Sequence, residues 1–424
     1  MLAHEMYSLV AELFPICRSI TGAGTRQTLF RLQQELPQMT IHDVPSGTQV
    51  FDWTVPKEWS IRDAYIETLE GQKIIDFKEN NLHVLGYSAP IDKIVTKEEL
   101  LSMVYTSPEH PDWIPYVTSY YKERSGFCMS ENQKNALNED KYHIVIDSNL
   151  FDGNLTYGEL IIPGETDEEI FFSTYVCHPS MANNELSGPA VAVALAKYVQ
   201  NINHRYTYRF VFIPETIGSI TYLSKNVDYL KNHVIAGFVL TCVGDNRTYS
   251  YIESPFGDNL ADRVAQNVLS FHYPDYSRYS FIDRGSDERQ YCSPLVNLPM
   301  CTICRSKYHV YPEYHTSADD LSLVSPEGLE GAYEVHRKCI DLLELNHNYM
   351  AVIPCEPQLG KRGLYPTISK HGIYNDVRPL QHFLAYVDGK HDLIDISNKI
   401  NVDIDVLKSV IKICKDNGLI TINK

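Results

Sequence analysis

The stretch Glu169-Ile-Phe-Phe-Ser-Thr-Tyr-Val-Cys177, followed by the small, apolar segment Ser187–Val199, decides the fold class. The first run is apolar almost throughout, as in a strand buried on both faces of a sheet, and the second has the composition of a buried helix. The same alternation continues to Leu345. Further strands are predicted at Tyr208–Ile213, Val234–Val243 and Met300–Ile303, and further helices at Ile217–Leu230, Asp258–Phe271 and Pro326–Leu345. The pattern predicts an α/β fold with a mostly parallel sheet and helices on both faces.

The segments on either side of this alternation differ in composition. Residues 41–135 contain turn signals, several prolines and many aromatic residues, and they predict an inserted β-rich domain. The helix predicted at Ala3–Phe14 ends at Pro15, so we expect residues 1–40 and 136–350 to form one domain. Residues 354–424 predict a small winged-helix domain. Its expected elements are helices at Asp376–Val387, Asp392–Ile400 and Asp403–Asn417 and a strand at Leu419–Ile422.

The composition restricts the class of protein. The 424 residues carry a formal net charge of -17, which disfavours nucleic acid as the main partner because phosphate binding needs patches of Lys and Arg. The N-terminus lacks the pattern of a signal peptide, and no run of about eighteen apolar residues occurs. We therefore expect a cytoplasmic protein without a membrane partner.

The ten cysteines are scattered, and several lie in apolar, strand-like stretches. In a reducing compartment they are interpreted as small buried hydrophobic residues. Cys301 and Cys304 form a lone CxxC pair. We interpret this pair as a coincidence, because residues three apart in a strand point to opposite faces and no second pair completes a zinc site.

Residues suited to catalysis follow the predicted strands, at the sheet edge where ligands bind in such folds. His178 and Glu215 directly follow two strands, Glu185 lies at the mouth of the next helix, and His315 precedes the last long helix. A hydrolytic zinc needs about three protein ligands, an open position for water and a nearby carboxylate base. We predict that His178, Glu185 and His315 bind zinc and that Glu215 is the general base.

Each of these residues also has a simpler interpretation. A His at a strand end is often a hydrogen-bonded surface side chain, and Glu215 alone is equally consistent with an ion pair. Asp245 fits a turn, and Asp319 fits the start of a helix, where acids are favoured. The catalytic interpretation depends on position: the loops that carry these acidic and histidine residues are all predicted at the ends of strands in one sheet.

The order of the motifs resembles that of the co-catalytic zinc aminopeptidases, the clan of the secreted bacterial leucine aminopeptidases and glutamate carboxypeptidase. The clan's pattern is His, Ala-Asn-Asp-Asn-Ala-Ser-Gly, Glu-Glu-x-Gly, Asp-Met-x-Gly, Ser-Asp-His and His-Thr-x-x-Asp. The corresponding residues here are His178, Ala182-Asn-Asn-Glu-Leu-Ser-Gly188, Glu215-Thr-Ile-Gly218, Thr241-Cys-Val-Gly244, Ser286-Asp-Glu288 and His315-Thr-Ser-Ala-Asp319. This resemblance covers roughly residues 160–346 and the N-terminal helix. Over nearly the whole chain, the sequence is similar to a bacterial family of aminopeptidase-like proteins that have a small inserted domain and a C-terminal winged helix.

Three carboxylate ligands of the clan are replaced in this sequence. The metal-bridging Asp falls on Asn184, the second Glu of the Glu-Glu pair on Thr216, and the Asp of the second zinc on Thr241. Either one zinc binds with substitute ligands, or catalytic zinc has been lost. We favour one zinc per chain, since three ligands suffice for one ion, with Glu185 as the substitute carboxylate. Further candidate substitutes are Asp245, Asp287 and Glu288.

The sequence therefore predicts a metallo-aminopeptidase that cleaves a peptide or a peptide-like amide. Asp287 or Glu288 is expected to hold the α-amine of the substrate. The alternative is a non-catalytic binding or regulatory protein that retains the hydrolase fold, with the winged helix as its output. The third helix of the tail carries three Lys residues but also several Asp residues, so we expect a solvated helix or a subunit contact, as in a homo-oligomer, rather than DNA reading.

Overall fold

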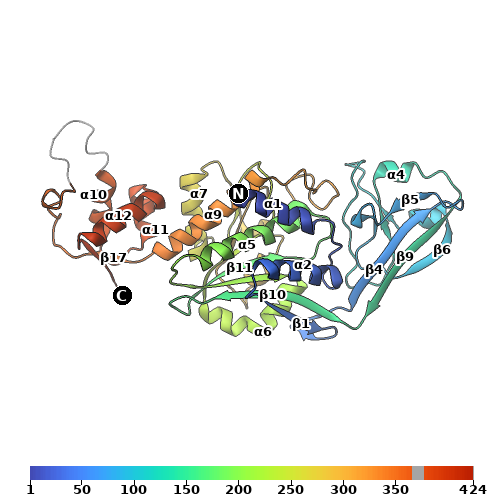
Figure 1. Ribbon diagram of the computed structural model, residues 1–424, viewed down its shortest axis with the longest axis horizontal. Helices are drawn as coiled ribbons and strands as arrows, with labels where there is room; N and C mark the ends of the chain where they lie inside the picture. The colour runs from blue at the N-terminus through green and yellow to red at the C-terminus, as the bar shows by residue number, and fades with distance from the viewer. Residues whose placement is uncertain (365–376, 424) are drawn as a thin grey trace.

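The computed structural model describes residues 1–364 and 377–423. The molecule is elongated, and its central α/β domain lies between the inserted domain at one end and the winged-helix domain at the other (Figure 1). The central domain is built on an eight-stranded sheet with the strand order β1-β10-β12-β11-β13-β16-β14-β15. The start of the helix predicted from Asp376 lies outside the described residues.

Four neighbouring strands in the middle of this sheet are parallel. They are β12 (Thr207–Ile213), β11 (Glu169–Tyr175), β13 (Val234–Val239) and β16 (Met300–Cys304). Every residue of β11 and β12 is buried, which explains their continuous apolar runs. The flanking strands are β1 (Thr40–Pro45), β10 (Asn154–Ile162), β14 (Ser250–Ile252) and β15 (Ser277–Tyr279). The predicted α/β fold with a mostly parallel sheet is confirmed.

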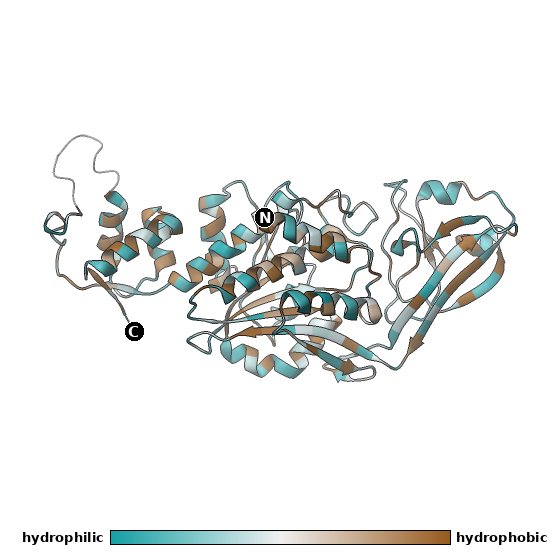
Figure 2. Ribbon diagram, viewed as in Figure 1, coloured by the Kyte–Doolittle hydropathy of each residue, from teal (hydrophilic) through white to brown (hydrophobic). Residues whose placement is uncertain are grey.

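Helices cover both faces of the sheet, and in Figure 2 its strands are largely brown, that is, apolar. One face is covered by α1 (Leu2–Leu13), α2 (Ala23–Glu35), α5 (Ser187–Gln200), α7 (Leu260–His272) and α9 (Pro326–Leu345). The opposite face is covered by α6 (Ile217–His233) and the short α8 (Glu288–Tyr291). Helix α5 packs against the sheet, α1 and α9, so its first ten residues are all buried. This position explains why its sequence is small and apolar on every side.

The inserted domain contains a four-stranded antiparallel sheet of order β5-β4-β9-β6. The bounds are β4 Glu58–Glu67, β5 Lys73–Asp76, β6 Ile91–Thr96 and β9 Lys141–Phe151. Its short elements are β2 (Gln49–Val50), β3 (Trp53–Thr54), α3 (Lys97–Leu101), β7 (Val104–Tyr105), β8 (Phe127–Cys128) and α4 (Glu131–Asn135).

The expected bounds of the insert, 41–135, differ from those of this sheet at both ends. Strand β1 still belongs to the central sheet, whereas β9 extends the small sheet beyond residue 135. The reason is that only two residues, Asp152 and Gly153, separate β9 from β10, so the chain passes from one sheet to the other without a linker. No change of composition marks such a boundary.

The winged-helix domain consists of α10 (Arg378–Tyr386), α11 (Leu393–Ile400) and α12 (Ile404–Asp416). Strand β18 (Ile420–Ile422) pairs antiparallel with β17 (Tyr349–Ala351). The predicted three helices and terminal strand are therefore present, and β17 places the beginning of the domain before Pro354. Among the described residues, no helix is long and apolar enough to cross a membrane.

A histidine inside the central domain makes the stability of the fold dependent on pH. His336 on α9 is fully buried, and its ring faces Phe172 and Phe238 at centroid distances of 6.5 and 6.1 Å. Its Nδ1–H donates to the carbonyl oxygen of Ala332 at 2.8 Å. Burial lowers the pKa of His336 to about 4.

The unfolded chain binds a proton at this residue near pH 6.5, whereas the folded chain does not bind it until about pH 4. The unfolded state therefore holds more protons between these values, so this contribution to stability is lost as the pH falls from about 6.5 to about 4. The expected loss is about 3 kcal/mol. In urea titrations across this range, His336→Leu should lose less stability on acidification than the wild type by that amount. His4→Leu, at an exposed position, is the control; parallel pH profiles for wild type and His336→Leu would contradict the prediction.

Candidate active site

The candidate site lies beyond the carboxyl ends of β11 and β12, where the chain changes direction within the sheet. From β11 the chain passes through α5 to β12 on one side, and from β12 it passes through α6 to β13 on the other side. Because α5 and α6 cover opposite faces, a crevice opens at the end of β11. His178 enters this crevice three residues after Tyr175, the last paired residue of β11.

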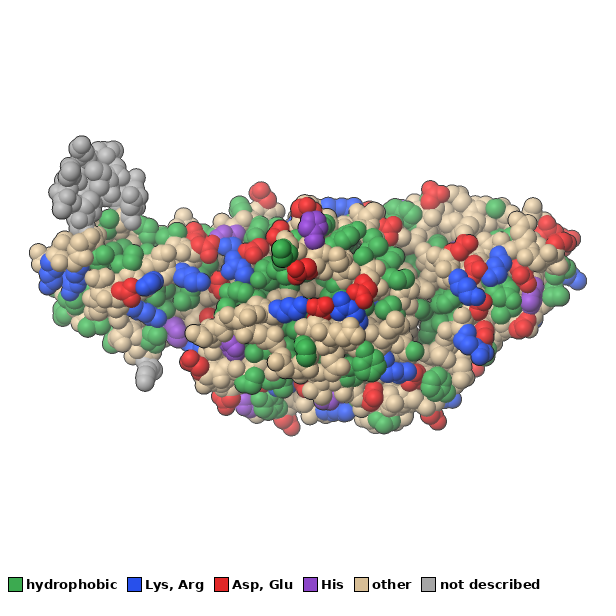
Figure 3. Space-filling view, viewed as in Figure 1, with side chains coloured by type: hydrophobic (Ala, Val, Ile, Leu, Met, Phe, Trp, Pro, Cys, Tyr) green, Lys and Arg blue, Asp and Glu red, His purple; other side chains and the backbone are tan. Residues whose placement is uncertain are grey.

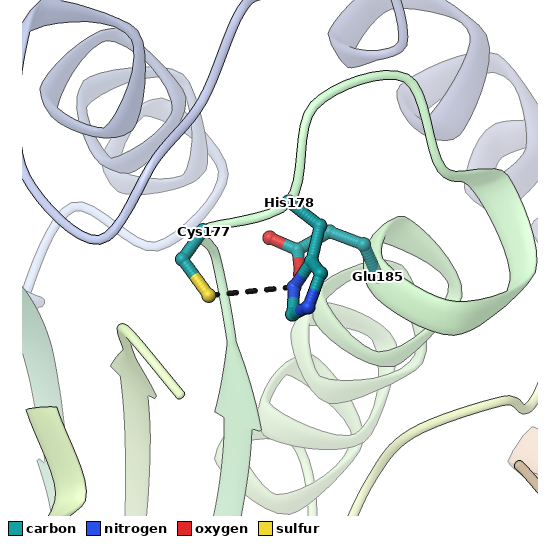
Figure 4. Close-up of side chains that lie close together, drawn as sticks. All are labelled: Cys177, His178 and Glu185. Carbon is teal, nitrogen blue, oxygen red and sulfur yellow. Dashed lines mark hydrogen bonds and ion pairs between the residues drawn. The ribbon is translucent and has the colours of Figure 1, made fainter. Parts of the chain in front are cut away.

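Both ring nitrogens of His178 face acidic side chains. Nδ1 lies 2.7 Å from a carboxylate oxygen of Glu185 and 3.4 Å from Sγ of Cys177 (Figure 4). Nε2 lies 3.6 Å from a carboxylate oxygen of Glu215. Burial lowers the pKa of His178, but Glu185 and Glu215 outweigh it, so the pKa lies above the ordinary value. The two carboxylates therefore hold the ring in one orientation.

Glu185 is placed by a single π-helical turn, η2 (Ala182–Leu186), that leads directly into α5. Asp319 anchors this turn, because its carboxylate accepts hydrogen bonds from the backbone N–H groups of Asn183 and Asn184 at 2.6 and 3.0 Å. Burial raises the pKa of Asp319 to about 6, against these hydrogen bonds. Asp319 therefore supports the loop that carries Glu185. It does not lie in the first turn of α9, which begins only at Pro326.

Arg18 is the buried counter-charge of Glu185, and sequence reasoning did not find it. Its Nε donates to the carbonyl oxygen of His178 at 3.0 Å and lies 3.7 Å from the second carboxylate oxygen of Glu185. Nη1 donates to the carbonyl oxygen of Leu13 at 2.6 Å. Arg18 is fully buried between α1 and α2. The sequence signal that could have identified it is a charged residue within the otherwise uncharged, largely apolar stretch 16–20.

Glu215 lies between β12 and α6, with its side chain largely buried. The next residue, Thr216, adopts a positive φ of 63°, and its N–H donates to Asp287 at 2.8 Å. This turn brings Glu215 beside His178. Burial raises the pKa of Glu215 above its ordinary value, while His178 and Arg289 oppose part of the rise. A carboxylate with a raised pKa is suited to accepting and returning a proton.

His315 faces His178 from the loop between β16 and α9, at a centroid distance of 5.3 Å. It adopts a positive φ of 57° and stacks on Tyr314 at 3.9 Å. Its Nε2 is buried without a hydrogen-bond partner. Burial, reinforced by the charge of His178, lowers the pKa of His315 well below the ordinary value. The ring is therefore neutral, and a lone pair is available.

The inserted domain closes one side of the site. The ring of Tyr116 lies 5.1 Å from both His178 and His315, and its backbone N–H donates to the carbonyl oxygen of His315 at 2.9 Å. A cleft of about 350 Å³ remains between the two domains. Its lining includes Trp53, Tyr116, Tyr121, His178, Glu215 and Arg289. Tyr116 was missed from sequence, although the tyrosine-rich segment around it was a visible signal.

The acids predicted to bind the substrate amine lie behind the cleft wall. Asp287 is buried, accepts from Thr216 N–H and from the Ser219 hydroxyl, and has its pKa raised to about 7 by burial and by Glu215. Glu288 is also buried and accepts hydrogen bonds from Tyr308 and two backbone N–H groups. Asp245 is buried and accepts from the N–H and the hydroxyl of Ser306 and from the side-chain amide of Asn183.

Several buried acceptor atoms around His178 have no donor. They include Nε2 of His315, one carboxylate oxygen of Glu185 and the side-chain oxygen of Asn184. Buried nitrogen and oxygen acceptors of this kind are suited to a cation such as zinc. Among the described residues, Cys177, His178 and Glu185 offer ligand atoms within 4.8 Å of one another. His315 does not belong to that compact group; the predicted set is thus brought into one site, but not into ligand distance.

The fold and this site define a protein of the zinc-aminopeptidase fold with a C-terminal winged-helix domain. Residues 7–346 match the family described as "Domain of unknown function (DUF4910)", and residues 347–422 match the description "winged helix-turn-helix". The chain belongs to the DUF4910 family. The winged-helix match begins before Pro354, in agreement with the position of β17.

Two comparisons concern Clostridium acetobutylicum. A protein named "Putative polysaccharide biosynthesis protein with aminopeptidase-like domain" is 47% identical over 410 residues, which cover 95% of this chain and 93% of the relative. A crystal structure of a "putative peptidase" is 45% identical with a TM-score of 0.93, covering 99% of this chain and 96% of that one. The zinc aminopeptidase of Bacillus subtilis has a TM-score of 0.58 at 13% identity, with coverages of 80% and 94%, and shows the fold alone.

We predict that removing Arg18 destabilises the protein through Glu185. In Arg18→Met the buried Glu185 carboxylate loses its cation, and such a loss costs about 3 kcal/mol or more. The double variant Arg18→Met/Glu185→Gln should recover part of that loss, because no charge is then left unpaired. Urea unfolding of the four proteins in this cycle measures the coupling. Arg31→Met, which breaks ion pairs on the surface, should cost less than about 1 kcal/mol; additive effects of Arg18→Met and Glu185→Gln would argue against the pairing.

Proposed function

We propose that this protein is a zinc-dependent, aminopeptidase-like hydrolase that cleaves a peptide or a peptide-like amide. The observation that carries the proposal is the meeting of His178, His315 and Glu215 at one cleft, with buried acceptor atoms that lack donors. The zinc-aminopeptidase fold and the aminopeptidase-like domain in the relative's name support it.

The residues that we propose to hold one zinc ion per chain are His178, His315 and Glu185. The neutral state of His315 favours this role, because a metal ligand must offer a free lone pair. Zinc, when bound, would lower the pKa of the attacking water and polarise the scissile carbonyl group.

Glu215 performs the proton transfers in this proposal. Its carboxylate takes a proton from the attacking water and returns it to the nitrogen of the leaving amine. The raised pKa of Glu215 makes the return step easier, since the protonated form is not strongly disfavoured. Tyr116 and its neighbours from the inserted domain exclude bulk water, which strengthens the electrostatic interactions inside the cleft.

One observation favours the alternative, a non-catalytic binding protein that retains the hydrolase fold. Two of the three residues at the clan's carboxylate positions belong to a neutral hydrogen-bond network: the side-chain amide of Asn184 donates to the Tyr175 hydroxyl at 3.0 Å, and the Thr241 hydroxyl donates to the carbonyl oxygen of Asn184 at 3.1 Å. The third, Thr216, holds Arg289 through its hydroxyl. A two-zinc centre of the clan's kind would find no carboxylate at these positions.

The two functions are distinguished by metal content and turnover. We expect the pure protein to contain about one zinc ion per chain. His178→Ala should lose this ion, because one of the three proposed ligands is removed. Glu215→Gln should keep the zinc and reduce hydrolysis of an aminoacyl amide by roughly a hundredfold or more. Metal analysis and amide hydrolysis by the two variants give the answer. A full equivalent of zinc in His178→Ala would exclude this ligand assignment, and a wild type without zinc or hydrolysis would favour the binding protein.

We propose that the winged-helix domain serves domain contact and assembly, not sequence reading in DNA. The first turns of α12 are tied to α9 by Lys338–Asp405 at 2.5 Å and Lys408–Asp341 at 3.9 Å. In helix-turn-helix proteins the start of the second helix contacts the bases, so these ion pairs would compete with DNA. On the face that Figure 3 displays, basic side chains over the winged-helix domain are interrupted by acidic ones, and Lys412 of α12 pairs with Asp416 at 2.7 Å, so the basic face that DNA reading needs is broken.

A chain that ends at Asn346 tests this role. Removal of the domain exposes the parts of α7 and α9 that α11 and α12 cover, so we expect a changed oligomeric state or lower solubility with the zinc retained. Light scattering of the shortened and intact chains is the measurement, paired with a DNA titration of the intact chain at physiological salt. Tight, sequence-dependent DNA binding, with no change of mass on truncation, would overturn the proposal.

A further inference from the structure

The wall of the cleft next to Glu215 carries a positive charge. Arg289 lies on α8 with an exposed side chain, and its Nη2 donates to the Thr216 hydroxyl at 2.7 Å. Because Thr216 directly follows Glu215, the guanidinium group lies within electrostatic reach of the proposed base. It also lines the same cleft as His178 and His315.

Arg289 differs from Arg247 and Arg278 in its partner. Arg247 pairs with Glu313 and Arg278 pairs with Glu253, both at 2.8 Å. In the part of the chain that the structure describes, the hydrogen-bond partner of Arg289 is a neutral hydroxyl group. In a protein of net charge -17, a guanidinium group at a cleft with no carboxylate in contact is a ready site for an anion.

The acids of the same segment do not cancel this charge at the cleft surface. Asp287 and Glu288 are buried and accept hydrogen bonds from groups of the protein. Neither lines the cleft, whereas Arg289 does. The group that α8 presents to a ligand beside Glu215 is therefore a cation, and it does not match the α-amine that Asp287 or Glu288 was predicted to bind.

We propose that Arg289 binds a carboxylate of the substrate close to the scissile amide, so that the preferred substrates are small acidic peptides or acidic amides. This inference rests on the proposed hydrolase function. The cleft volume of about 350 Å³ is suited to a ligand of this size. Trp53 and Tyr121, with exposed fractions of 39% and 56%, form an edge-to-face pair with a centroid distance of 5.5 Å and supply an aromatic wall for the rest of the ligand.

Binding of probes that cannot be hydrolysed separates this inference from catalysis. The probes are pseudodipeptides in which CH₂ replaces the scissile carbonyl group. The first pair is Phe-Ala with a C-terminal carboxylate or carboxamide, and the second is Asp-Ala or Asn-Ala, both with a carboxamide end. The first pair reports a terminal carboxylate and the second a side-chain carboxylate. Calorimetry with the full-length, zinc-loaded protein measures each dissociation constant.

We expect the acidic member of at least one pair to bind about tenfold or more tightly than its neutral partner, as for a charge-assisted hydrogen bond. Arg289→Gln should abolish this preference, and Arg289→Lys should keep only part of it, because a point charge replaces the planar fork of donors. Arg284→Gln makes the same change of charge at an exposed arginine that does not line the cleft, and it should leave the preference intact.

Equal binding of the acidic and neutral probes, no binding of any probe, or a preference that survives Arg289→Gln would each overturn the inference. Hydrolysis of the corresponding true dipeptides is measured separately. A protein that binds the acidic probes through Arg289 but hydrolyses nothing would retain the inference and lose the proposed hydrolase function. For a hydrolysing protein, Arg289→Gln should raise KM for the acidic dipeptide more than KM for the matched neutral dipeptide.

Discussion

The buried carboxylate of Glu185 is the constraint on which the site depends. A carboxylate removed from water needs compensating charge or hydrogen bonds, and Glu185 has Arg18 on one side and His178 on the other. Both partners are thereby fixed: Arg18 ties the chain between α1 and α2 to the end of β11, and the imidazole of His178 is turned so that Nε2 faces Glu215. The N-terminal helices are therefore part of the site, although they are far from it in sequence.

The inserted domain completes the site through backbone pairing. Tyr116 pairs with His315 by its N–H group, and Ser317 and Ile114 exchange two further hydrogen bonds. These contacts hold aromatic side chains over the loop of His315, which has an unfavourable positive φ at that residue. The insert thus stabilises the loop conformation and also limits the access of water, which joins the two domains into one functional unit.

The sequence predicts the elements of this fold better than it predicts the atoms of the site. Continuous apolar runs marked β11 and β12 because both strands are buried on both faces, and the strand-end rule placed His178, Glu215 and His315 at one edge. Strand β9 was not assigned to the insert because no loop separates it from the central sheet. Arg18, Tyr116 and Arg289 depend on contacts between segments that are distant in sequence, and no local pattern specifies such contacts.

The charges of the site connect the residues that replace the clan's carboxylates with the cation in the cleft wall. A two-zinc centre needs several carboxylates to offset its cations, and here Asn184, Thr216 and Thr241 stand at those positions. With one zinc, the buried charges that remain around it are Glu185, matched by Arg18, and Glu215, opposed by Arg289. Thr216 contributes to this charge balance directly. Where the clan has a carboxylate, its neutral hydroxyl group accepts a hydrogen bond from Arg289. A carboxylate at position 216 would form an ion pair with this arginine and occupy it. In the proposed function, Thr216 at a clan ligand position therefore accounts both for one metal ligand fewer and for a cation that remains available to a ligand.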